Sequence, residues 1–364
     1  MLKCDVYNDN ITPVVNICQS LQEKNIDYTK KRNIIEKKEV TNMKLYTVSG
    51  ESTNPYENLA LENYLMHIAP ENSCILYLWQ NEPTVVIGRN QNPWKECRTS
   101  LLQEHGVHLA RRYSGGGAVY HDLGNMNFTF VAKEDCYDQD KNFAVLKNAC
   151  EQLGIQIEHS GRNDLLANGF KFSGNAFLHQ NGVACHHGTL LINSDFSKLG
   201  EYLTPPKAKL QAKGITSVRS RVTNLNALSP DITITKMHLA LLDAFNHIYS
   251  NKAVPLPLPD NAQAIIGEKA KTLRDPNWLF GNRIAMTYSV EGKFPWGYIC
   301  IDFQVASGIV DAVAVYTDSL DWTLAETIQK ALTGISFQKN KMLSALENEI
   351  SSAILTDIST LLNI

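Results

Sequence analysis

The sequence predicts an α+β protein in which a large domain over residues 43–282 precedes a small α+β domain over residues 283–364. Strand-like and helix-like patterns alternate from residue 43 onward. Two Asn-Gly pairs, Asn168-Gly169 and Asn181-Gly182, indicate tight hairpin turns in the middle of the chain. After the proline-rich stretch Pro255–Asp260, strand patterns begin again and are followed by helical ones. The roughly 80 residues beyond residue 282 are enough for a small domain.

The composition is that of an ordinary globular protein. Of 364 residues, 44% are hydrophobic and 20% are charged, and the formal net charge of −3 gives no reason to expect a nucleic-acid partner. No stretch reaches the roughly 18 apolar residues of a membrane span, so no membrane partner is expected. The eight cysteines are scattered without a C-x-x-C pair, which favours reduced, buried thiols. We expect a cytoplasmic location, or a mitochondrial one if the source is eukaryotic.

Residues 1–42 differ from the rest of the chain. Basic and acidic residues alternate there, apolar periodicity is poor, and no apolar run typical of a signal peptide is present. The many acidic residues also argue against a transit peptide. Met43 then opens the apolar, strand-like run Leu45–Val48. We expect residues 1–42 to be an unstructured N-terminal extension or a mis-assigned start, with Met43 as the true first residue.

Apolar periodicity and turn residues predict the elements of the large domain in order. The expected helices are Pro55–His67, Trp94–His105, Asn142–Leu153 and Lys236–Ser250. The expected strands are Ile75–Trp79, Thr84–Gly88, Val107–Ala110 and Phe128–Val131, the first two on either side of the turn Gln80–Pro83. The Asn-Gly turns then join Asp164–Ala167, Phe170–His179 and Val183–Ile192 into a three-strand meander.

The small domain follows a rigid connector at Pro255–Asp260. Its expected strands are Tyr298–Val305 and Ile309–Tyr316, and its expected helices are Leu324–Leu332 and Lys341–Leu362. Strands followed by helices are typical of an α+β arrangement.

The most informative motif is the run Arg111–Asp122 (RRYSGGGAVYHD), which lies between two predicted strands. Its three glycines let backbone N–H groups turn inward and form an anion-binding concavity. Arg111 and Arg112 add charge and forked donors suited to phosphate or carboxylate. The run lacks the Gly-Lys-Ser/Thr of a Walker loop, and it leads into a strand rather than a helix, unlike the dinucleotide fingerprint. We expect an anionic ligand here; a plain glycine-rich turn with solvated arginines is the alternative.

The middle strand of the meander carries a second candidate. Because side chains alternate along a strand, Lys171, Ser173 and Asn175 are expected to share one face. Beside an anion-binding loop, Lys171 would hold an anion or polarise a carbonyl, although a lone lysine near a turn is more often solvated. Asp164, which opens the meander, would hold Mg²⁺ near phosphates or be a plain turn aspartate.

Two other features bear on the same site. The adjacent His186 and His187 point to opposite faces of their strand, so they are poor joint metal ligands and one of them is expected to face the site. The basic segment Lys207–Arg221 contains Gly214 as a possible hinge, and it is interpreted as a mobile loop that closes over a nucleotide. A solvated charged surface is the alternative interpretation of this segment.

Seven motifs along the chain occur in the same order as in a known enzyme family. They are Asn58–Glu62 (NLALE), Thr84–Cys97 (TVVIGRNQNPWKEC), Arg111–Asp122 (RRYSGGGAVYHD), Gly161–Leu165 (GRNDL), Lys171–Ala176 (KFSGNA), His186–Leu191 (HHGTLL) and Lys213–Leu225 (KGITSVRSRVTNL). Through them the chain resembles the lipoate-protein ligase A family over residues 43–364, whereas residues 1–42 have no counterpart. The resemblance implies a biotin/lipoate ligase-like mixed-sheet catalytic domain with a small α+β C-terminal accessory domain.

The resemblance also implies an activity. A lipoate-protein ligase of this kind converts lipoate and ATP, with Mg²⁺, to lipoyl-AMP and pyrophosphate, and then transfers the lipoyl group to a lysine. The implied acceptors are lipoyl domains of 2-oxoacid dehydrogenase E2 subunits and the glycine cleavage H protein. The chemistry is reasonable because a carboxylate is a poor electrophile, and the acyl-phosphate anhydride gives it a good leaving group.

The resemblance further assigns roles to individual residues. Lys171 is implied as the catalytic residue, stabilising charge on the lipoyl carbonyl and the adenylate phosphate. The implied ATP-binding residues are Arg112, Gly117, Ala118, Val119, Tyr120, Asp164 and Lys171, with Asp164 also as the Mg²⁺ ligand. The implied lipoate-binding residues are Leu59, Val86, Arg112, Ser114, Gly117, His121, Lys171 and His187. Tyr120 stands where the compared family member has phenylalanine, so the stacking ring is retained with an added hydroxyl.

Four rival functions are compared with this one. Acyltransferases of the same fold that use a cysteine nucleophile are disfavoured, because no cysteine occurs between Cys185 and Cys300. A lipoyltransferase that starts from preformed lipoyl-AMP keeps most of the motifs and stays open. Biotin ligase is disfavoured by the glycine loop and the Lys171 strand. A non-catalytic binding module is disfavoured by the intact Lys171 and Asp164.

Overall fold

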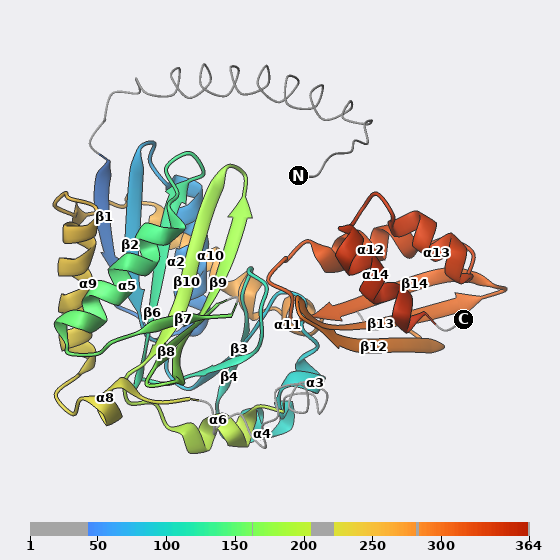
Figure 1. The fold of residues 1–364 in the computed structure, drawn as a ribbon, viewed down its shortest axis with the longest axis horizontal. Coiled ribbons are helices and arrows are strands. Elements are labelled where there is room, and N and C mark those ends of the chain that lie inside the picture. The colour runs from blue at the N-terminus through green and yellow to red at the C-terminus, as the bar shows by residue number, and fades with distance from the viewer. Residues whose placement is uncertain (1–42, 162, 205–221, 282–283, 363–364) are drawn as a thin grey trace, which may run out of the picture. The chain divides into compact units, whose positions relative to one another are not determined.

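The computed structural model describes residues 43–161, 163–204, 222–281 and 284–362 (Figure 1). The predicted extension 1–42 and the predicted mobile loop Lys207–Arg221 lie outside the described residues. Within these ranges no helix is both long enough and apolar enough to cross a membrane.

An eight-stranded sheet is the frame of the chain between residues 44 and 255 (Figure 1). Its strands, in order across the sheet, are β11 (Val254–Pro255), β1 (Lys44–Ser49), β2 (Ser73–Trp79), β6 (Asn125–Lys133), β10 (Val183–Leu191), β9 (Phe170–Gln180), β8 (Asp164–Ala167) and β7 (Glu158–Ser160). The first three are parallel to one another, and the remaining neighbours pair antiparallel. Every residue of β2 is buried, which explains its continuous apolar run.

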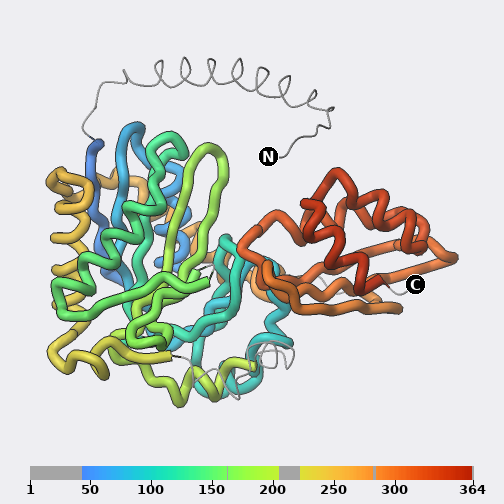
Figure 2. Tube along the Cα trace, in the orientation of Figure 1, coloured from blue at the N-terminus to red at the C-terminus, as the bar shows by residue number. Residues whose placement is uncertain are grey.

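Helices cover both faces of this sheet (Figure 2). On one face, α5 (Gln139–Gln152) and α9 (Ile234–Ile248) bury Val145 and Phe245 against Phe128 and Phe130 of β6. On the other face, α2 (Pro55–Ile68) and α10 (Ala262–Arg274) pack over the alternate side chains of β2, such as Tyr77. This second layer also holds the candidate site described below.

A smaller sheet carries the glycine loop. Its strand order is β4 (His108–Arg111), β3 (Thr84–Ile87) and β5 (Val119–His121), so the loop between β4 and β5 passes the end of β3. Four short helices complete this region and the connection from the large sheet: α3 (Pro93–Glu96), α4 (Thr99–Glu104), α6 (Phe196–Tyr202) and α8 (Leu225–Leu228). The glycine loop therefore lies between strands, as predicted.

The C-terminal part of the chain has its own core. After α11 (Pro276–Phe280), the antiparallel sheet β12 (Tyr288–Phe294), β13 (Gly297–Ala306) and β14 (Ile309–Thr317) packs against α12 (Leu324–Leu332), α13 (Lys339–Leu346) and α14 (Ser352–Leu361). Fully buried side chains such as Phe303, Ile328 and Met342 fill the space between sheet and helices. The α+β prediction for this region is confirmed.

The predicted meander is confirmed together with its turn chemistry. Asn168 and Asn181 have φ of 51° and 53°, and the glycines after them have φ of 79° and 73°. These left-handed values are those of the two-residue hairpin turn that favours Asn-Gly. β8, β9 and β10 accordingly pair antiparallel in sequence order.

Three predicted elements are wrong in detail. The helix predicted over Trp94–His105 is two helices, because Cys97 is extended and bridges to Leu203. The helix predicted over Lys341–Leu362 is likewise two, α13 and α14. The second begins where the Ser351 hydroxyl accepts the backbone N–H of Ile354. The expected connector Pro255–Asp260 begins inside β11, which pairs with β1.

Candidate active site

A cavity of about 720 Å³ lies over the face of the large sheet that α2 covers. The large sheet, the glycine loop and two C-terminal segments around residues 293–295 and 318–320 all contribute to its wall. Eleven of the predicted site residues line it: Leu59, Val86, Arg112, Gly117, Ala118, Val119, Tyr120, His121, Asp164, Lys171 and His187. Ser114 lies behind the wall, fully buried, and touches the lining through His187.

One row of cross-strand neighbours forms the floor of the cavity. Trp79 of β2 pairs with Asn127 of β6, which pairs with Thr189 of β10. The Thr189 hydroxyl accepts the backbone N–H of Gly174 on β9, and Gly174 pairs with Asp164 on β8. The floor thus runs from an indole ring at one end to a carboxylate at the other.

Lys171 reaches this floor for a different reason from the one predicted. The pairing of β8 with β9 shifts register between Leu165 and Leu166, which leaves Phe172 as an extra residue on β9. Such a bulge reverses the alternation of side chains. Lys171 therefore lies on the same face of β9 as Gly174. A Cβ atom added to Gly174 would lie 2.9 Å from the lysine Nζ. The prediction that Lys171 shares a face with Ser173 and Asn175 is wrong.

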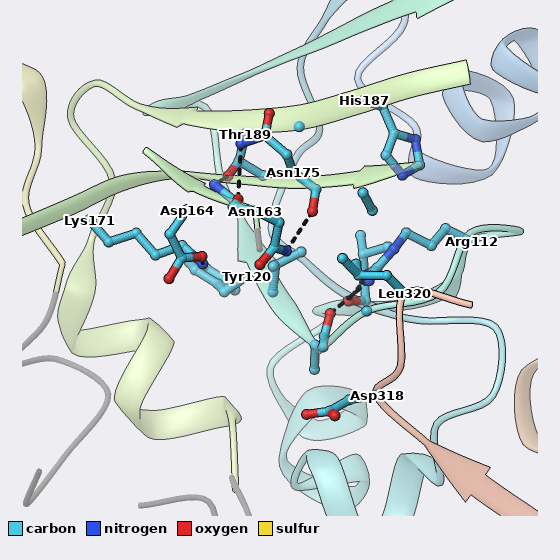
Figure 3. A pocket seen from close by; sticks show the side chains of 18 of the residues that line it. Arg112, Tyr120, Asn163, Asp164, Lys171, Asn175, His187, Thr189, Asp318 and Leu320 are labelled. Atoms are coloured by element: carbon cyan, nitrogen blue, oxygen red, sulfur yellow. Dashed lines mark hydrogen bonds and ion pairs between the residues drawn. The ribbon is translucent and has the colours of Figure 1, made fainter. Parts of the chain in front are cut away.

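Lys171 and Asp164 form an ion pair at the polar end of the cavity. The lysine Nζ lies 2.6 Å from Asp164 Oδ1, and the two side chains are 27% and 18% exposed. Asn163 and Asn175 fix the adjoining backbone, since each donates its side-chain amide to the other's carbonyl oxygen. Figure 3 shows Lys171 and Asp164 together, apart from Arg112 and His187. A movable cation and a hard carboxylate oxygen at one spot suit a phosphate and its Mg²⁺.

The two arginines of the glycine loop differ in role. Arg111 is 6% exposed and donates to backbone carbonyl oxygens, including those of Gln91 and Leu279. Its donors are therefore used within the fold, which corrects both the prediction that it binds an anion and the alternative that it is solvated. Arg112 lines the cavity and donates to the carbonyl oxygens of Gly115 and Gly117 at 2.7 and 2.9 Å. Burial lowers the pKa of Arg112 to about 10, so it stays a cation.

The glycine loop also contacts the C-terminal part of the chain. Gly116, with φ of +91°, donates its N–H to the Ser319 carbonyl oxygen at 2.9 Å. The side chain of Leu320 lines the cavity just beyond this contact. At least one backbone N–H of the loop, that of Gly116, is therefore bonded within the protein. That the loop binds an anion stays a prediction.

The opposite end of the cavity is largely apolar. Leu59, Val86 and Trp79 line it, and the imidazole of His121 packs edge-on to Trp79. Asn81 donates to His121 Nδ1 at 3.1 Å, and burial lowers the pKa of His121 to about 3. His121 is thus a neutral wall residue here, which suits an apolar ligand chain.

The two adjacent histidines of β10 separate as predicted. His187 faces the cavity side and bonds both Glu62 and Ser114. His186 is fully buried on the other face, where it donates Nε2–H to Asn175 and packs among phenylalanines.

Tyr120 packs its ring against Tyr202 with centroids 5.6 Å apart, while also lining the cavity. Burial raises the pKa of the Tyr120 phenol. An aromatic wall is therefore in place beside the polar end, at the position where the resemblance implied adenine contact.

Several lining residues were not singled out from the sequence. Trp79 and Thr189 belong to predicted strands, and Asn127 lies one residue before the predicted strand Phe128–Val131. The register of these three residues across the sheet brings them to the floor. Lys293, Asp318 and Leu320 come from the C-terminal part of the chain. For Asn127, the alternation of Asn125, Asn127 and Thr129 with apolar residues along β6 was an available signal. For the three C-terminal residues no local signal exists, because their place depends on packing between distant segments.

Comparisons with known proteins agree with this geometry. The profile of the lipoyl protein ligase A/B catalytic domain family matches residues 54–246, and that of the bacterial lipoate protein ligase C-terminus matches residues 283–361. Lipoate-protein ligase A of Psychrobacter cryohalolentis is 40% identical over 306 residues, which cover 82% of this chain and 90% of that protein. Lipoate-protein ligase A of Blochmanniella pennsylvanica is 41% identical over 311 residues, covering 83% and 92%.

A solved structure extends the similarity to three dimensions. P. falciparum LipL1 in complex with lipoate superposes with a TM-score of 0.77 and 29% sequence identity, covering 87% of this chain and 98% of that one. The chain belongs to the lipoate-protein ligase A family, and it is a lipoate-protein ligase.

Proposed function

We propose that this ligase activates lipoate with ATP and then transfers the lipoyl group from lipoyl-AMP to a lysine of an acceptor protein. In the first step a lipoate carboxylate oxygen attacks the α-phosphorus of ATP, and pyrophosphate leaves. In the second the amine of the acceptor lysine attacks the lipoyl carbonyl, and AMP leaves as the amide forms. The proposed acceptors are lipoyl domains of 2-oxoacid dehydrogenase E2 subunits and the glycine cleavage H protein.

One observation carries the proposal: the Lys171–Asp164 pair stands at one end of a single cavity whose other end is largely apolar. An eight-carbon acid with a dithiolane ring fits the apolar end, among Leu59, Val86 and His121. That orientation brings its carboxylate toward Lys171, which would stabilise the charge that develops on the oxyanion and on the α-phosphate. The relative LipL1 is known in complex with lipoate, which supports the same ligand for this chain.

ATP would occupy the polar end. Its α-phosphate would lie near Lys171 and its base near Tyr120, whose ring already lines the cavity. Mg²⁺ bound to the phosphates would take Asp164 as a protein ligand, since this ion prefers one or two carboxylates together with phosphate oxygens. The ion would supply charge neutralisation for the leaving pyrophosphate.

Incubation with an apo lipoyl domain tests the proposal in three arms. With ATP and lipoate, mass spectrometry of the acceptor should show the mass gain of one lipoyl group. With lipoate alone there should be no gain, and with supplied lipoyl-AMP alone there should be the same gain. A gain only with supplied lipoyl-AMP would identify a lipoyltransferase instead, and no gain in any arm would contradict both functions.

A further inference from the structure

A chain of buried hydrogen bonds connects helix α2 to the glycine loop. Glu62 Oε2 lies 2.8 Å from His187 Nδ1, and His187 Nε2 lies 2.7 Å from Ser114 Oγ. Arg112 Nε donates to the same Ser114 oxygen at 3.0 Å. The four exposed fractions are 4%, 8%, 0% and 7% in the order Glu62, His187, Ser114 and Arg112. We refer to these four residues as the Glu62 relay.

The donors and acceptors of the relay fit one arrangement. Trp79 donates its indole N–H to the Thr129 hydroxyl, and that hydroxyl donates to Glu62 Oε2. A carboxylate accepts only, so His187 presents Nδ1–H to Glu62, and in the neutral imidazole Nε2 is then an acceptor. Ser114 then donates O–H to Nε2 and accepts Nε–H from Arg112. The carboxylate thereby fixes which nitrogen of His187 carries the proton.

The relay also connects two buried charges. Arg112 carries a guanidinium and Glu62 a carboxylate, and His187 and Ser114 lie between them. A buried charge without such compensation is costly, because the protein interior solvates it poorly. Arg112 directs its remaining donors to loop carbonyls, including Gly115 and Gly117. The hydrogen bonds thus run without a break from Glu62 to the part of the loop that lines the cavity.

Two other interpretations of the cluster do not fit. The order serine–histidine–carboxylate matches a nucleophilic triad, but Ser114 is fully buried behind the cavity wall and its oxygen already accepts from Arg112. Ligand atoms of Glu62, Cys185 and His187 lie within 4.8 Å of one another, as in a metal site. Burial raises the pKa of the Cys185 thiol far above its usual value, and the His187 nitrogen that faces Glu62 carries a proton.

We propose that Glu62 is a positioning residue for lipoate binding, which acts through His187 and Ser114 to hold the cavity wall and Arg112 in the binding geometry. The inference rests on the proposed function only in taking lipoate as the occupant of the apolar end. Glu62 does not line the cavity, so its effect on lipoate passes through His187, which does.

Glu62→Gln is the first test, since it keeps the volume of the side chain and removes its charge. A hydrogen bond to a charged group contributes enough free energy to change a binding constant roughly tenfold to a hundredfold. We expect the lipoate Kd, measured by calorimetry without ATP, and the lipoate KM to rise by about that factor. The kcat at saturating lipoate should change much less, because Lys171 and Asp164 are untouched. In ¹⁵N spectra the Nδ1–H resonance of the His187 ring should shift, because a neutral amide oxygen replaces the carboxylate as its acceptor.

A matched pair of histidine variants controls for general damage to the core. His187→Phe and His186→Phe each replace a buried imidazole on the same strand, but only the first interrupts the relay. We expect the lipoate Kd to rise in His187→Phe and to stay within about twofold in His186→Phe. Ser114→Ala provides a small change at the far end of the relay if Glu62→Gln does not fold.

A double-mutant cycle between Glu62→Gln and Ser114→Ala decides whether the residues act together. Members of one network are non-additive, so the double variant should bind lipoate about as weakly as the worse single variant. Additive effects, or a lipoate Kd unchanged in Glu62→Gln and Ser114→Ala, would overturn the relay. A wild-type enzyme that binds lipoate in a Glu62-dependent way yet forms no lipoyl-AMP would overturn only the proposed function. A wild-type enzyme that does not bind lipoate would overturn both.

Discussion

At the scale of single residues, the neighbouring arginines of the glycine loop show how the same side chain serves two purposes. Arg111 donates to the backbone carbonyl oxygens of Gln91 and Leu279 and so connects two segments that are far apart in the sequence. Arg112 also donates to carbonyl oxygens, but it does so from the wall of the cavity. The motif alone does not separate these roles, because the partners of Arg111 come from distant parts of the chain.

We predict that Arg111→Lys lowers the stability of the fold and that Arg112→Lys raises the lipoate KM. A lysine cannot reproduce the forked donors of a guanidinium, so the backbone carbonyls around Arg111 lose hydrogen-bond donors. The free energy of unfolding should therefore fall by about 1–3 kcal/mol. The lipoate KM of the folded Arg111→Lys enzyme should stay near the wild-type value. Arg112→Lys should instead raise the lipoate KM. Urea unfolding and steady-state kinetics on both variants check this, and equal kinetic effects would contradict the assignment.

Lys171 illustrates what sequence analysis achieves at a single position. Its place in the site was predictable from the motif KFSGNA, and the structure puts it in the cavity. The predicted face was wrong, because strict alternation cannot anticipate a bulge at Phe172. The ion pair with Asp164 was also not predicted, since it depends on the register of β8 against β9.

At the scale of elements, predictions held where the deciding interactions are local. The Asn-Gly turns specify the β8–β9–β10 meander through the backbone conformation of two residues each. The helix predicted over Trp94–His105 failed because Cys97 pairs with Leu203, about a hundred residues away along the chain. The break before α14 had a local signal, the capping Ser351, that apolar periodicity hid.

The glycine loop provides an element-scale prediction. A Cβ at Gly115 would overlap the Ser319 carbonyl oxygen and lie 2.8 Å from that of Leu320. Gly115→Ala should therefore lower the free energy of unfolding by roughly 1–3 kcal/mol, because the loop and the 318–320 segment must move apart. Thermal and urea unfolding measure this.

Gly267→Ala is the matched control for that experiment. Gly267 lies within α10, and a Cβ there would meet no atom within 4 Å. Alanine should raise stability by about 0.5–1 kcal/mol, because it removes the entropy cost of a helical glycine. Destabilisation of the same size by both substitutions would contradict the packing account of Gly115.

At the scale of the whole molecule, the cavity is assembled from segments that are far apart in the sequence. Leu59, Lys171 and Leu320 all line it, although they come from the N-terminal, middle and C-terminal parts of the described chain. The motifs NLALE and KFSGNA predicted that Leu59 and Lys171 belong to the site. The contribution of Leu320 follows from the contact of Ser319 with Gly116, for which the sequence has no local pattern.

From the lowered pKa values of two buried histidines we predict how the stability of the whole molecule depends on pH. Burial lowers the pKa of both His121 and His186 from 6.5 to about 3. Between those values the unfolded chain binds protons that the folded protein does not, so stability is complete above pH 6.5 and falls as the pH decreases toward 3. Each group contributes a limiting slope of about 1.4 kcal/mol per pH unit in this window.

Removing one of these groups should flatten the pH dependence. In His186→Phe the slope of unfolding free energy against pH, measured by urea unfolding between about pH 4.5 and 6 (roughly the middle of the window), should be smaller than in the wild type. The comparison uses slopes, so a constant difference in stability does not affect it. Identical slopes would show that the pKa of His186 is not lowered in the folded protein.

Pyrophosphate release in the absence of an acceptor protein tests the central claim most directly, namely that the cavity activates lipoate beside Lys171. With ATP and lipoate the wild type should release pyrophosphate in a lipoate-dependent manner, and Lys171→Ala should be slower by about a hundredfold or more, since a charge stabiliser of this kind contributes roughly 3 kcal/mol. Lys147→Ala, which removes an exposed lysine on α5, should release it at the wild-type rate. Near wild-type release from a folded Lys171→Ala enzyme, or release that does not require lipoate, would contradict the account.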